Sequence, residues 1–449
     1  MILARTFAKD VAWQYSATAS TILAEFMTIW FVANSLGSTA VGAISFGYSF
    51  SFVINQLFDV RSTEIVIKFL TQSVYRSSAS ESISVIWASF ATEFGLRFSA
   101  LVTGIAIAFA GANIGYLERP TLVVLCLSLV YVFFGTMFMG PARGVFRVLN
   151  CFRTQAFVAI FAAFLKVLSV LLVLYQLNPT VDHVIVAILL ASIVTPVLLI
   201  ACTYRCILAK FSPKSVLRLS FYEVRSSLNL PEVLSFAKYQ YFSTLMMIPT
   251  KEMDIGILAG ISDLQTVGFY KLAKNIASAI NSVPDAVFMA SYPVLTKYVE
   301  AKHFKEMWEF VRKLTWFLLV GSTVGVLVAC IVYPHVVSFV FGDEFRASTG
   351  YFRILAIGII FWAPLVWFNP LLLAAGRADV IAKGAFLGSL MVLMTCLGAS
   401  HCFGAIGIAI AMALSTPIVF ACIFALAKRE KVFEAISAST PFEGDGKSV

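Results

Sequence analysis

The sequence predicts an all-α integral membrane protein, with about twelve transmembrane helices in two pseudo-symmetric six-helix bundles around a central cavity. Three observations lead to this fold class. The chain of 449 residues is 60% hydrophobic and only 13% charged, a composition that soluble domains do not have. Apolar segments of about 20 residues, long enough to cross a bilayer, recur along the chain. Short motifs also repeat at an offset of about half the chain.

Two stretches carry the repeat most clearly. Ile-Asn-Ser-Val-Pro-Asp at 280–285 echoes Ile-Asn-Gln-Leu-Phe-Asp at 54–59, an offset of 226 residues (285 − 59). The same offset, within two residues, relates Val41-Gly42 to Val267-Gly268 and Cys151–Arg153 to Ala375–Arg377. An internal duplication explains this near-constant offset. We therefore expect an amino-terminal six-helix bundle over residues 1–215, and a carboxyl-terminal one with a short cytoplasmic tail over residues 216–449.

Each half holds six apolar segments separated by polar turns. In the first half we expect spans over residues 11–33, 41–59, 83–110, 121–139, 154–175 and 183–204. In the second half we expect spans over residues 232–257, 264–290, 314–333, 347–374, 380–400 and 404–427. An amphipathic connector is expected over residues 61–81, and Gly140-Pro141 is expected to break the chain after the fourth span.

Basic residues are distributed unevenly between the predicted loops. With the amino terminus placed in the cytoplasm, most of the 33 Lys and Arg residues fall in cytoplasmic segments, and the external loops receive only Arg119 and Arg346. This positive-inside bias predicts a multi-pass protein with an even number of spans and both termini cytoplasmic. Topology and attraction to anionic membrane lipid explain the basic linkers, so we expect no nucleic-acid partner.

The predicted span over residues 264–290 carries polar and charged side chains on one face. Lys271, Lys274, Ser278, Asn281 and Asp285 recur at steps of three and four residues, which aligns them in a single helical stripe. Such a stripe is costly inside a membrane and is expected to face a protein interior or a water-filled cavity. The alternative is a set of structural salt bridges between helices.

Charged and amide side chains within the spans form the candidate functional site, and their excess of cations favours an anionic cargo. The candidate cargo-binding residues are Lys166, Lys238, Lys251, Lys271, Lys274, Arg353, Asn281 and Asn55. The candidate residues for coupling to a proton or sodium gradient are Asp59, Asp285, Glu25 and Asp254.

Structural roles compete with these assignments. A single lysine can snorkel to the membrane surface. Asp59 and Asp285 can instead pair permanently with cations, Asp59 with Arg61. Glu93 and Arg97, four residues apart in the third span, are expected to form a local ion pair.

Motifs of catalysis and cofactor binding are missing from the sequence. It contains no Gly-x-x-x-x-Gly-Lys-[Ser/Thr] phosphate loop, no His-Glu-x-x-His and no Gly-x-Ser-x-Gly. The eight cysteines include no Cys-x-x-Cys, and the four histidines lie far apart. We therefore expect no cofactor, no metal site and no enzymatic activity.

Five short motifs are similar to those of a known family: Leu36–Gly42, Asp254 with Leu258–Gly260, Val267–Ala273, Tyr292–Leu295 and Ala375–Arg377. On these motifs the chain resembles, over nearly its whole length, the Wzx-type oligosaccharide flippases of the multidrug/oligosaccharidyl-lipid/polysaccharide exporter superfamily. The resemblance implies the bacterial inner membrane and an undecaprenyl-pyrophosphate-linked oligosaccharide repeat unit as cargo. It also implies alternating access driven by an ion gradient.

Other functions stay open at this point. A drug exporter of the same superfamily would handle cations and is expected to have an acidic cavity. A membrane-embedded polysaccharide polymerase or ligase is expected to have large external loops rich in Arg and His, which are absent. Polysaccharide polymerase and chain-length components are candidate partners. The glycan stays open too, with lipopolysaccharide O-antigen and exopolysaccharide units both candidates.

Overall fold

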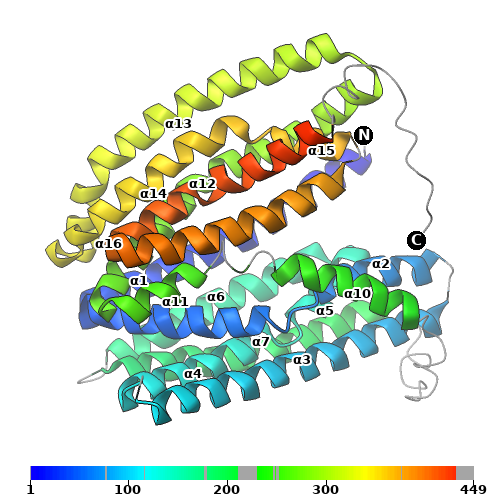
Figure 1. The fold of residues 1–449 in the computed structure, drawn as a ribbon. Helices are drawn as coiled ribbons and strands as arrows, with labels where there is room; N and C mark the ends of the chain where they lie inside the picture. Colours follow the sequence, from blue (N-terminus) through cyan, green and yellow to red (C-terminus); the bar gives the residue numbers. More distant parts are fainter. Residues whose placement is uncertain are drawn as a thin grey trace. The chain divides into compact units, whose positions relative to one another are not determined.

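The computed structural model describes residues 2–430 except 76–77, 116, 176–178, 211–229, 246–247, 249–251 and 376. Every regular element of the described residues is a helix, which confirms the all-α prediction. By compactness the chain forms a first unit, Met1–Ile248, and a second unit, Pro249–Val449. This division lies after the predicted one at residues 215 and 216, because α10 (Leu230–Leu245) packs against α2 (Ser62–Tyr75) of the first unit (Figure 1).

The first unit is a bundle of long helices joined by short connections. Besides α2 and α10 it contains α1 (Ile2–Gln56), α3 (Ala79–Asn113), α4 (Arg119–Thr136), α5 (Met139–Val148), α6 (Phe152–Leu174) and α7 (Val181–Lys210). α1 contains both of the first two predicted spans and bends between them at Gly37, where φ is 80°, a conformation that favours glycine. α1 packs on α6 and α4, and α7 packs on α4 and α6.

The fourth predicted span breaks earlier than the sequence suggested. α4 ends at Thr136, and Phe138 has a left-handed backbone with φ of 67° before α5 begins at Met139. The expected break at Gly140-Pro141 was placed too late. Proline is tolerated in the first turn of a helix, where its missing N–H has no intrahelical partner, so Pro141 lies inside α5 near its start.

The second unit contains α11 (Met253–Ile261), α12 (Leu264–Glu300), α13 (Phe304–Phe341), α14 (Thr349–Trp362), α15 (Phe368–Ala374) and α16 (Ala378–Arg429), with short 3-10 turns η1 (Asp343–Ser348) and η2 (Ala363–Leu365). α16 contains the last two predicted spans and bends at Gly404, where φ is 58°. α14 packs against α12, α13 and α16. The break at η2 before the short helix α15 resembles the break between α4 and α5.

Eight helical stretches of the described residues are long and apolar enough to cross a membrane. Two of them, the stretches that bend at Gly37 and Gly404, each contain two predicted spans. The other two predicted spans, over residues 232–257 and 264–290, correspond to α10 with α11 and to α12. α12 is not among the eight stretches. The protein is therefore a multi-pass membrane protein whose helices follow the predicted pattern of six spans in each half.

Candidate functional site: a cationic cavity in the first unit

A cavity of about 350 Å³ lies inside the first unit, between α1, α4, α5, α6 and α7. Three basic residues line it: Arg143 and Arg147 from α5, and Lys166 from α6. The one acidic residue in its lining is Glu25 from α1. The break between α4 and α5 gives α5 its own direction, which brings both arginines to the cavity.

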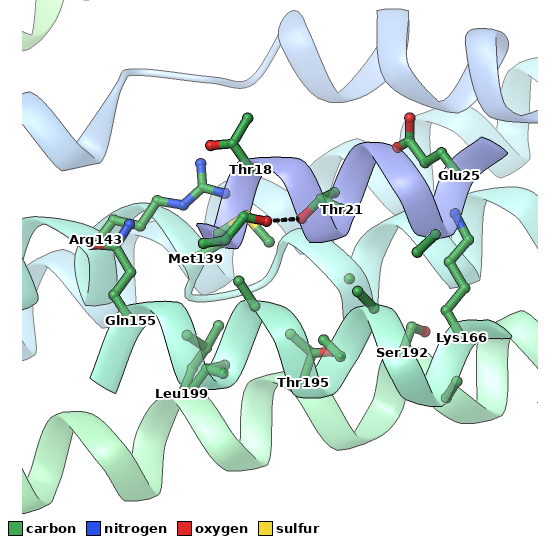
Figure 2. A pocket seen from close by; sticks show the side chains of 18 of the residues that line it. Thr18, Thr21, Glu25, Met139, Arg143, Gln155, Lys166, Ser192, Thr195 and Leu199 are labelled. Carbon is green, nitrogen blue, oxygen red and sulfur yellow. Dashed lines mark hydrogen bonds between the residues drawn. The ribbon is translucent and has the colours of Figure 1, made fainter. Parts of the chain in front are cut away.

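The cavity is elongated, and polar side chains occur along it among mostly apolar ones (Figure 2). Arg143 and Gln155 lie together toward one end, and Lys166 and Glu25 face each other at the other end. The stretch between them is lined by the hydroxyl side chains of Thr18, Thr21, Ser192 and Thr195. Guanidinium and ammonium groups offer donors to an anion. Thr21 and Ser192 already donate to the backbone carbonyls of Ala17 and Leu189, so their hydroxyl oxygens can accept hydrogen bonds from a sugar. The lining thus suits a phosphorylated saccharide.

The basic residues of this cavity are short of carboxylate partners. Among the ion pairs within 4.0 Å that the described residues form, none includes Arg143, Arg147 or Lys166. The side chains of Glu25 and Tyr131 interact electrostatically with the Lys166 ammonium. Arg143 and Arg147 are four residues apart on α5 and repel each other. Positive charge is therefore left for a ligand to neutralise.

A second cavity, of about 420 Å³, adjoins the first in the same unit. Tyr131, Gly135, Met139 and Arg143 line both cavities. The second is also lined by Asn55 and Asp59, which lie in the last residues of the second predicted span, and by Arg97 from α3.

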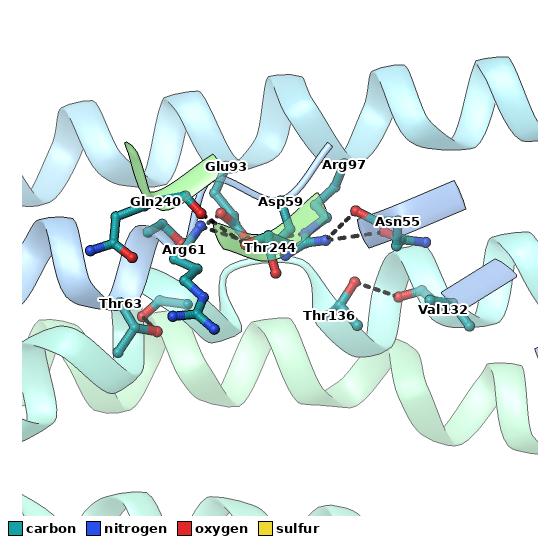
Figure 3. Close-up of polar contacts among 12 residues, drawn as sticks. Asn55, Asp59, Arg61, Thr63, Glu93, Arg97, Val132, Thr136, Gln240 and Thr244 are labelled. Carbon is teal, nitrogen blue, oxygen red and sulfur yellow. Dashed lines mark hydrogen bonds and ion pairs between the residues drawn. The ribbon is translucent and has the colours of Figure 1, made fainter. Parts of the chain in front are cut away.

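Arg97 is the centre of a buried polar network beside this second cavity (Figure 3). Its guanidinium lies 2.9 Å from Glu93 Oε1 and 3.6 Å from Asp59 Oδ1, and it donates a 3.2 Å hydrogen bond to the carbonyl of Asn55. Ser62 donates to the other oxygen of Glu93 at 2.7 Å. The predicted ion pair of Glu93 and Arg97 is confirmed, and it extends across helices to Asp59.

Asp59 also accepts a 2.8 Å hydrogen bond from the backbone N–H of Arg61. Arg61 has a left-handed backbone with φ of 52°, in the turn between α1 and α2. Asp59 therefore lies between a guanidinium from α3 and the start of α2, at a point where three elements of the first unit meet.

The second unit holds its own charged cluster, at the start of α11 and α12. Asp254 is completely buried and accepts hydrogen bonds from Tyr270 at 2.5 Å and from Lys274 at 2.9 Å. Lys271 lies 3.1 Å from a carboxylate oxygen of Glu252, and Lys274 lies 3.9 Å from the other. Both lysines of the predicted stripe therefore have carboxylate partners, as in the salt-bridge alternative.

The remaining predicted residues are dispersed. Asn281 accepts a 2.6 Å hydrogen bond from the indole N–H of Trp362 in the second unit. Lys238 on α10 and Arg353 on α14 are exposed. Lys251 lies outside the described residues, and so does the side chain of Asp285, although its backbone belongs to α12. Among the described residues no group of His, Cys, Asp and Glu could hold a metal ion.

A family model decides the class of this molecule. The model described as "Polysaccharide biosynthesis protein" matches residues 7–299. The chain belongs to the polysaccharide biosynthesis protein family. None of the curated proteins matches it.

Solved structures share the fold of this polysaccharide biosynthesis protein. An inward-facing multidrug resistance MATE transporter of the MOP superfamily matches with a TM-score of 0.71 at 12% identity, over 94% of this chain and 96% of that one. Lipid II flippase MurJ, in an inward closed conformation, gives 0.69 at 14% identity, over 95% and 90%. A MOP superfamily transporter from Pyrococcus furiosus, described as having a binding pocket of reverse polarity, gives 0.60 at 11% identity, over 96% of each chain. At these identities the comparisons show the fold alone.

The most basic part of this family member's cavity was missed by the sequence analysis. Arg143 and Arg147 were placed in a loop, because the fourth span was expected to end at Met139. Two arginines four residues apart, directly after Gly140-Pro141, are the signal that could have placed them on one face of a new helix. Gln155, at the first turn of α6, carried no comparable signal.

Proposed function

We propose that this protein is a flippase, which moves an undecaprenyl-pyrophosphate-linked oligosaccharide repeat unit across the bacterial inner membrane by alternating access. The observation that carries the proposal is the cavity of the first unit, where Arg143, Arg147 and Lys166 have no carboxylate within 4.0 Å among the described residues. Guanidinium groups match phosphate oxygens in geometry, and the ammonium adds a point charge. Membership of the polysaccharide biosynthesis family and a transporter fold support the same conclusion.

Two other functions fit less well. The cavity of a drug exporter for cations would need a surplus of acid, but here one carboxylate faces three cations. A polymerase or ligase would need groups that activate a saccharide hydroxyl for attack, and this cavity offers only Glu25, beside a lysine. We infer a transporter rather than an enzyme, with both termini in the cytoplasm and polysaccharide polymerase and chain-length components as partners.

The cargo site is tested by the double substitution of Arg143→Gln and Lys166→Gln. In proteoliposomes carrying a lipid-linked oligosaccharide, the flipping rate is followed by the access of an external lectin to the saccharide. Loss of two charge-assisted hydrogen bonds, each of about 1.5–3 kcal/mol, is expected to lower transport at least about a hundredfold. The fold is expected to survive, because both side chains line a cavity.

The matched control is Arg312→Gln with Lys305→Gln, which removes the same two charges from exposed positions on α13. This control is expected to flip the lipid at the unmodified rate. An unmodified rate in the Arg143 and Lys166 variant would reject the site.

Coupling to an ion gradient is the second part of the proposal, with Asp59, Asp285, Glu25 and Asp254 as the coupling groups. Asp59 lies beside Arg97 and Asp254 beside Lys274, so protonation of either carboxylate would release a cation for a change of state. Asp285→Asn is expected to yield folded protein whose transport no longer responds to an imposed pH or sodium gradient. Flipping that still follows the gradient at the unmodified rate would remove Asp285 from this role.

A further inference from the structure

The second cavity of the first unit, of about 420 Å³, has no ligand in the proposed function. Its volume falls within the range of about 300–1,000 Å³ that is usual for ligand pockets. It shares four lining residues with the cationic cavity, and one of them, Gly135, adds no side chain to the shared wall. Even a Cβ atom at Gly135 would lie 3.8 Å and 4.0 Å from its nearest neighbours, in the side chains of Tyr131 and Ser192. A ligand in the first cavity therefore has room to extend past Gly135 into the second.

Three aromatic rings form a row in the lining of the second cavity. They belong to Phe52 and Tyr48 from α1 and to Tyr131 from α4, and all three residues are half-buried. The Tyr48 ring centroid lies 6.2 Å from that of Phe52 and 6.4 Å from that of Tyr131. The face of an aromatic ring is negative, so it attracts the C–H groups on the face of a sugar ring and repels a phosphate. This row favours a saccharide ring over a second anionic group.

Two polar side chains of the same cavity have no partner within the part of the chain that the structure describes. Gln56, at the end of α1, and Glu64, in the first turn of α2, line the cavity and form no side-chain hydrogen bond or ion pair with other described residues. An amide both donates and accepts hydrogen bonds, and a carboxylate accepts them. Sugar hydroxyls can satisfy both groups, whereas a hydrocarbon chain would leave both unpaired.

The charges of the second cavity are more nearly balanced than those of the first. Besides the arginine that both cavities share, its lining contains Arg61 and Arg97 against Asp59 and Glu64. Arg97 is already within 2.9 Å of Glu93 and 3.6 Å of Asp59 (Figure 3). The first cavity has three cations for one carboxylate. The surplus of positive charge therefore falls from the first cavity to the second, and an acidic sugar in the second would lie near like charges.

We propose that the second cavity binds the sugar that is linked to the pyrophosphate, and that it selects an uncharged ring over an acidic one at this place. That the ligand is a lipid-linked saccharide rests on the proposed function. The sugar site itself rests on the aromatic row, the two unpartnered polar groups, the charge balance and the open junction at Gly135.

The test measures binding by calorimetry to the full-length protein in nanodiscs. Three ligands are compared: a two-isoprene diphosphate, the same diphosphate linked to a hexose, and the same diphosphate linked to the corresponding hexuronic acid. The hexose is expected to tighten binding about tenfold, the scale of a ring contact with one hydrogen bond. The hexuronic acid is expected to add nothing. A hexose ligand that binds no more tightly than the bare diphosphate would overturn the sugar site, and equal binding of the two sugars would overturn the selection.

A double substitution in the aromatic row makes the test specific. Tyr48→Leu with Phe52→Leu keeps apolar side chains but removes two ring faces, so it is expected to abolish the gain from the hexose and to leave binding of the bare diphosphate unchanged. The matched control is Phe94→Leu with Phe98→Leu, a stacked pair on α3 with ring centroids also 6.2 Å apart. These two residues are 45% and 51% exposed and line neither cavity. A gain that survives in the Tyr48 and Phe52 variant would reject the aromatic row as the sugar site.

The selection against acidic sugars has its own variant. Glu64→Gln removes a carboxylate without a partner among the described residues, and it is expected to strengthen binding of the hexuronic acid ligand about threefold with little effect on the hexose ligand. Glu118→Gln removes the same charge at an exposed position that lines neither cavity, and it should leave all three ligands unchanged. An unchanged preference in Glu64→Gln would show that this carboxylate does not select the sugar.

The bare diphosphate separates this proposal from the proposed function. If Arg143→Gln with Lys166→Gln does not weaken the bare diphosphate, the cationic site of the proposed function fails, and the gain from the hexose still decides the sugar site. If that double variant weakens the bare diphosphate but the hexose adds no affinity in the unmodified protein, the sugar site fails while the cationic site stands. Absence of binding by all three ligands would reject both.

Discussion

The two units differ in whether their clustered cations have carboxylate partners. In the first unit, Arg143, Arg147 and Lys166 line a cavity without carboxylates close to them among the described residues. In the second unit, Lys271 and Lys274 lie against Glu252 and Asp254. The contrast suggests that the positive charge of the first unit is available to a ligand, and that the positive charge of the second holds α11 and α12 together.

The two units also differ in backbone at the repeated stretches, residues 54–59 and 280–285. α1 ends at Gln56, and the chain turns through Asp59 before α2 begins. In the second unit α12 continues without a break through the equivalent position, residue 285, as far as Glu300. The turn allows Asp59 to approach Arg97 from α3. The two copies of the repeat therefore share residue types, but the first lies at the end of a helix and the second lies within a continuous helix.

The largest expected effect is on the stability of the second unit. Asp254→Ala removes the nearer carboxylate of Lys274 and the acceptor of the Tyr270 hydroxyl, which leaves Lys274 with only the Glu252 oxygen 3.9 Å away. Loss of one partner of a buried pair costs about 3–5 kcal/mol, and we expect a loss of that order in the free energy of unfolding in detergent.

Replacing both members of that pair provides the control. Asp254→Leu with Lys274→Met removes both charges of the pair and leaves Lys271 paired with Glu252, so it is expected to recover most of the lost stability. If Asp254→Ala keeps the unmodified stability but weakens binding of a diphosphate, the cluster is a ligand site and the contrast between the units is wrong.

A smaller effect is expected at the network of the first unit. Arg97→Met leaves Glu93, which is 1% exposed, without its cation, although Ser62 still donates to it at 2.7 Å. We expect a loss of about 2–3 kcal/mol in unfolding free energy, less than at Asp254 because one hydrogen bond and the nearby cavity remain. A thermal denaturation series would check it. A larger loss of unfolding free energy for Arg97→Met than for Asp254→Ala would contradict the prediction that the cluster of the second unit contributes more to stability.

Most of the fold could be predicted because it depends on local features of the chain. Apolar length sets the spans, and Gly37 and the connector at 61–81 fall where the helices bend or change direction. The break at Phe138 could not be predicted, because a left-handed phenylalanine has no local signal and is held by packing. Phe90 and Phe94 lie 5.3 and 6.2 Å from its ring.

The candidate site could be predicted only in part, because pairing of charges is a tertiary property. The stripe of α12 was visible as a period in the sequence, but its partners Glu252 and Asp254 belong to α11 and meet it only in the fold. Lys166 was visible as a lone charge in an apolar span. That Arg143 and Arg147 share its cavity depends on the break before α5, which the sequence placed two residues too late.

The smallest expected effect concerns Glu25, the one carboxylate in the lining of the cationic cavity. Its carboxylate faces Lys166 and attracts the ammonium electrostatically. An anionic ligand in the cavity must therefore compete with Glu25 for the positive charge of Lys166. Glu25 is exposed, and exposed pairs contribute about 0.2–1 kcal/mol. Glu25→Gln keeps the size of the side chain and is expected to strengthen diphosphate binding by about 1.5- to 5-fold, as measured by calorimetry. Thr18→Val, in the same lining, is the control without a change of charge. If Glu25→Gln instead weakens binding, the carboxylate itself helps to hold the ligand, and the cavity is not the simple cationic site that distinguishes the first unit from the second.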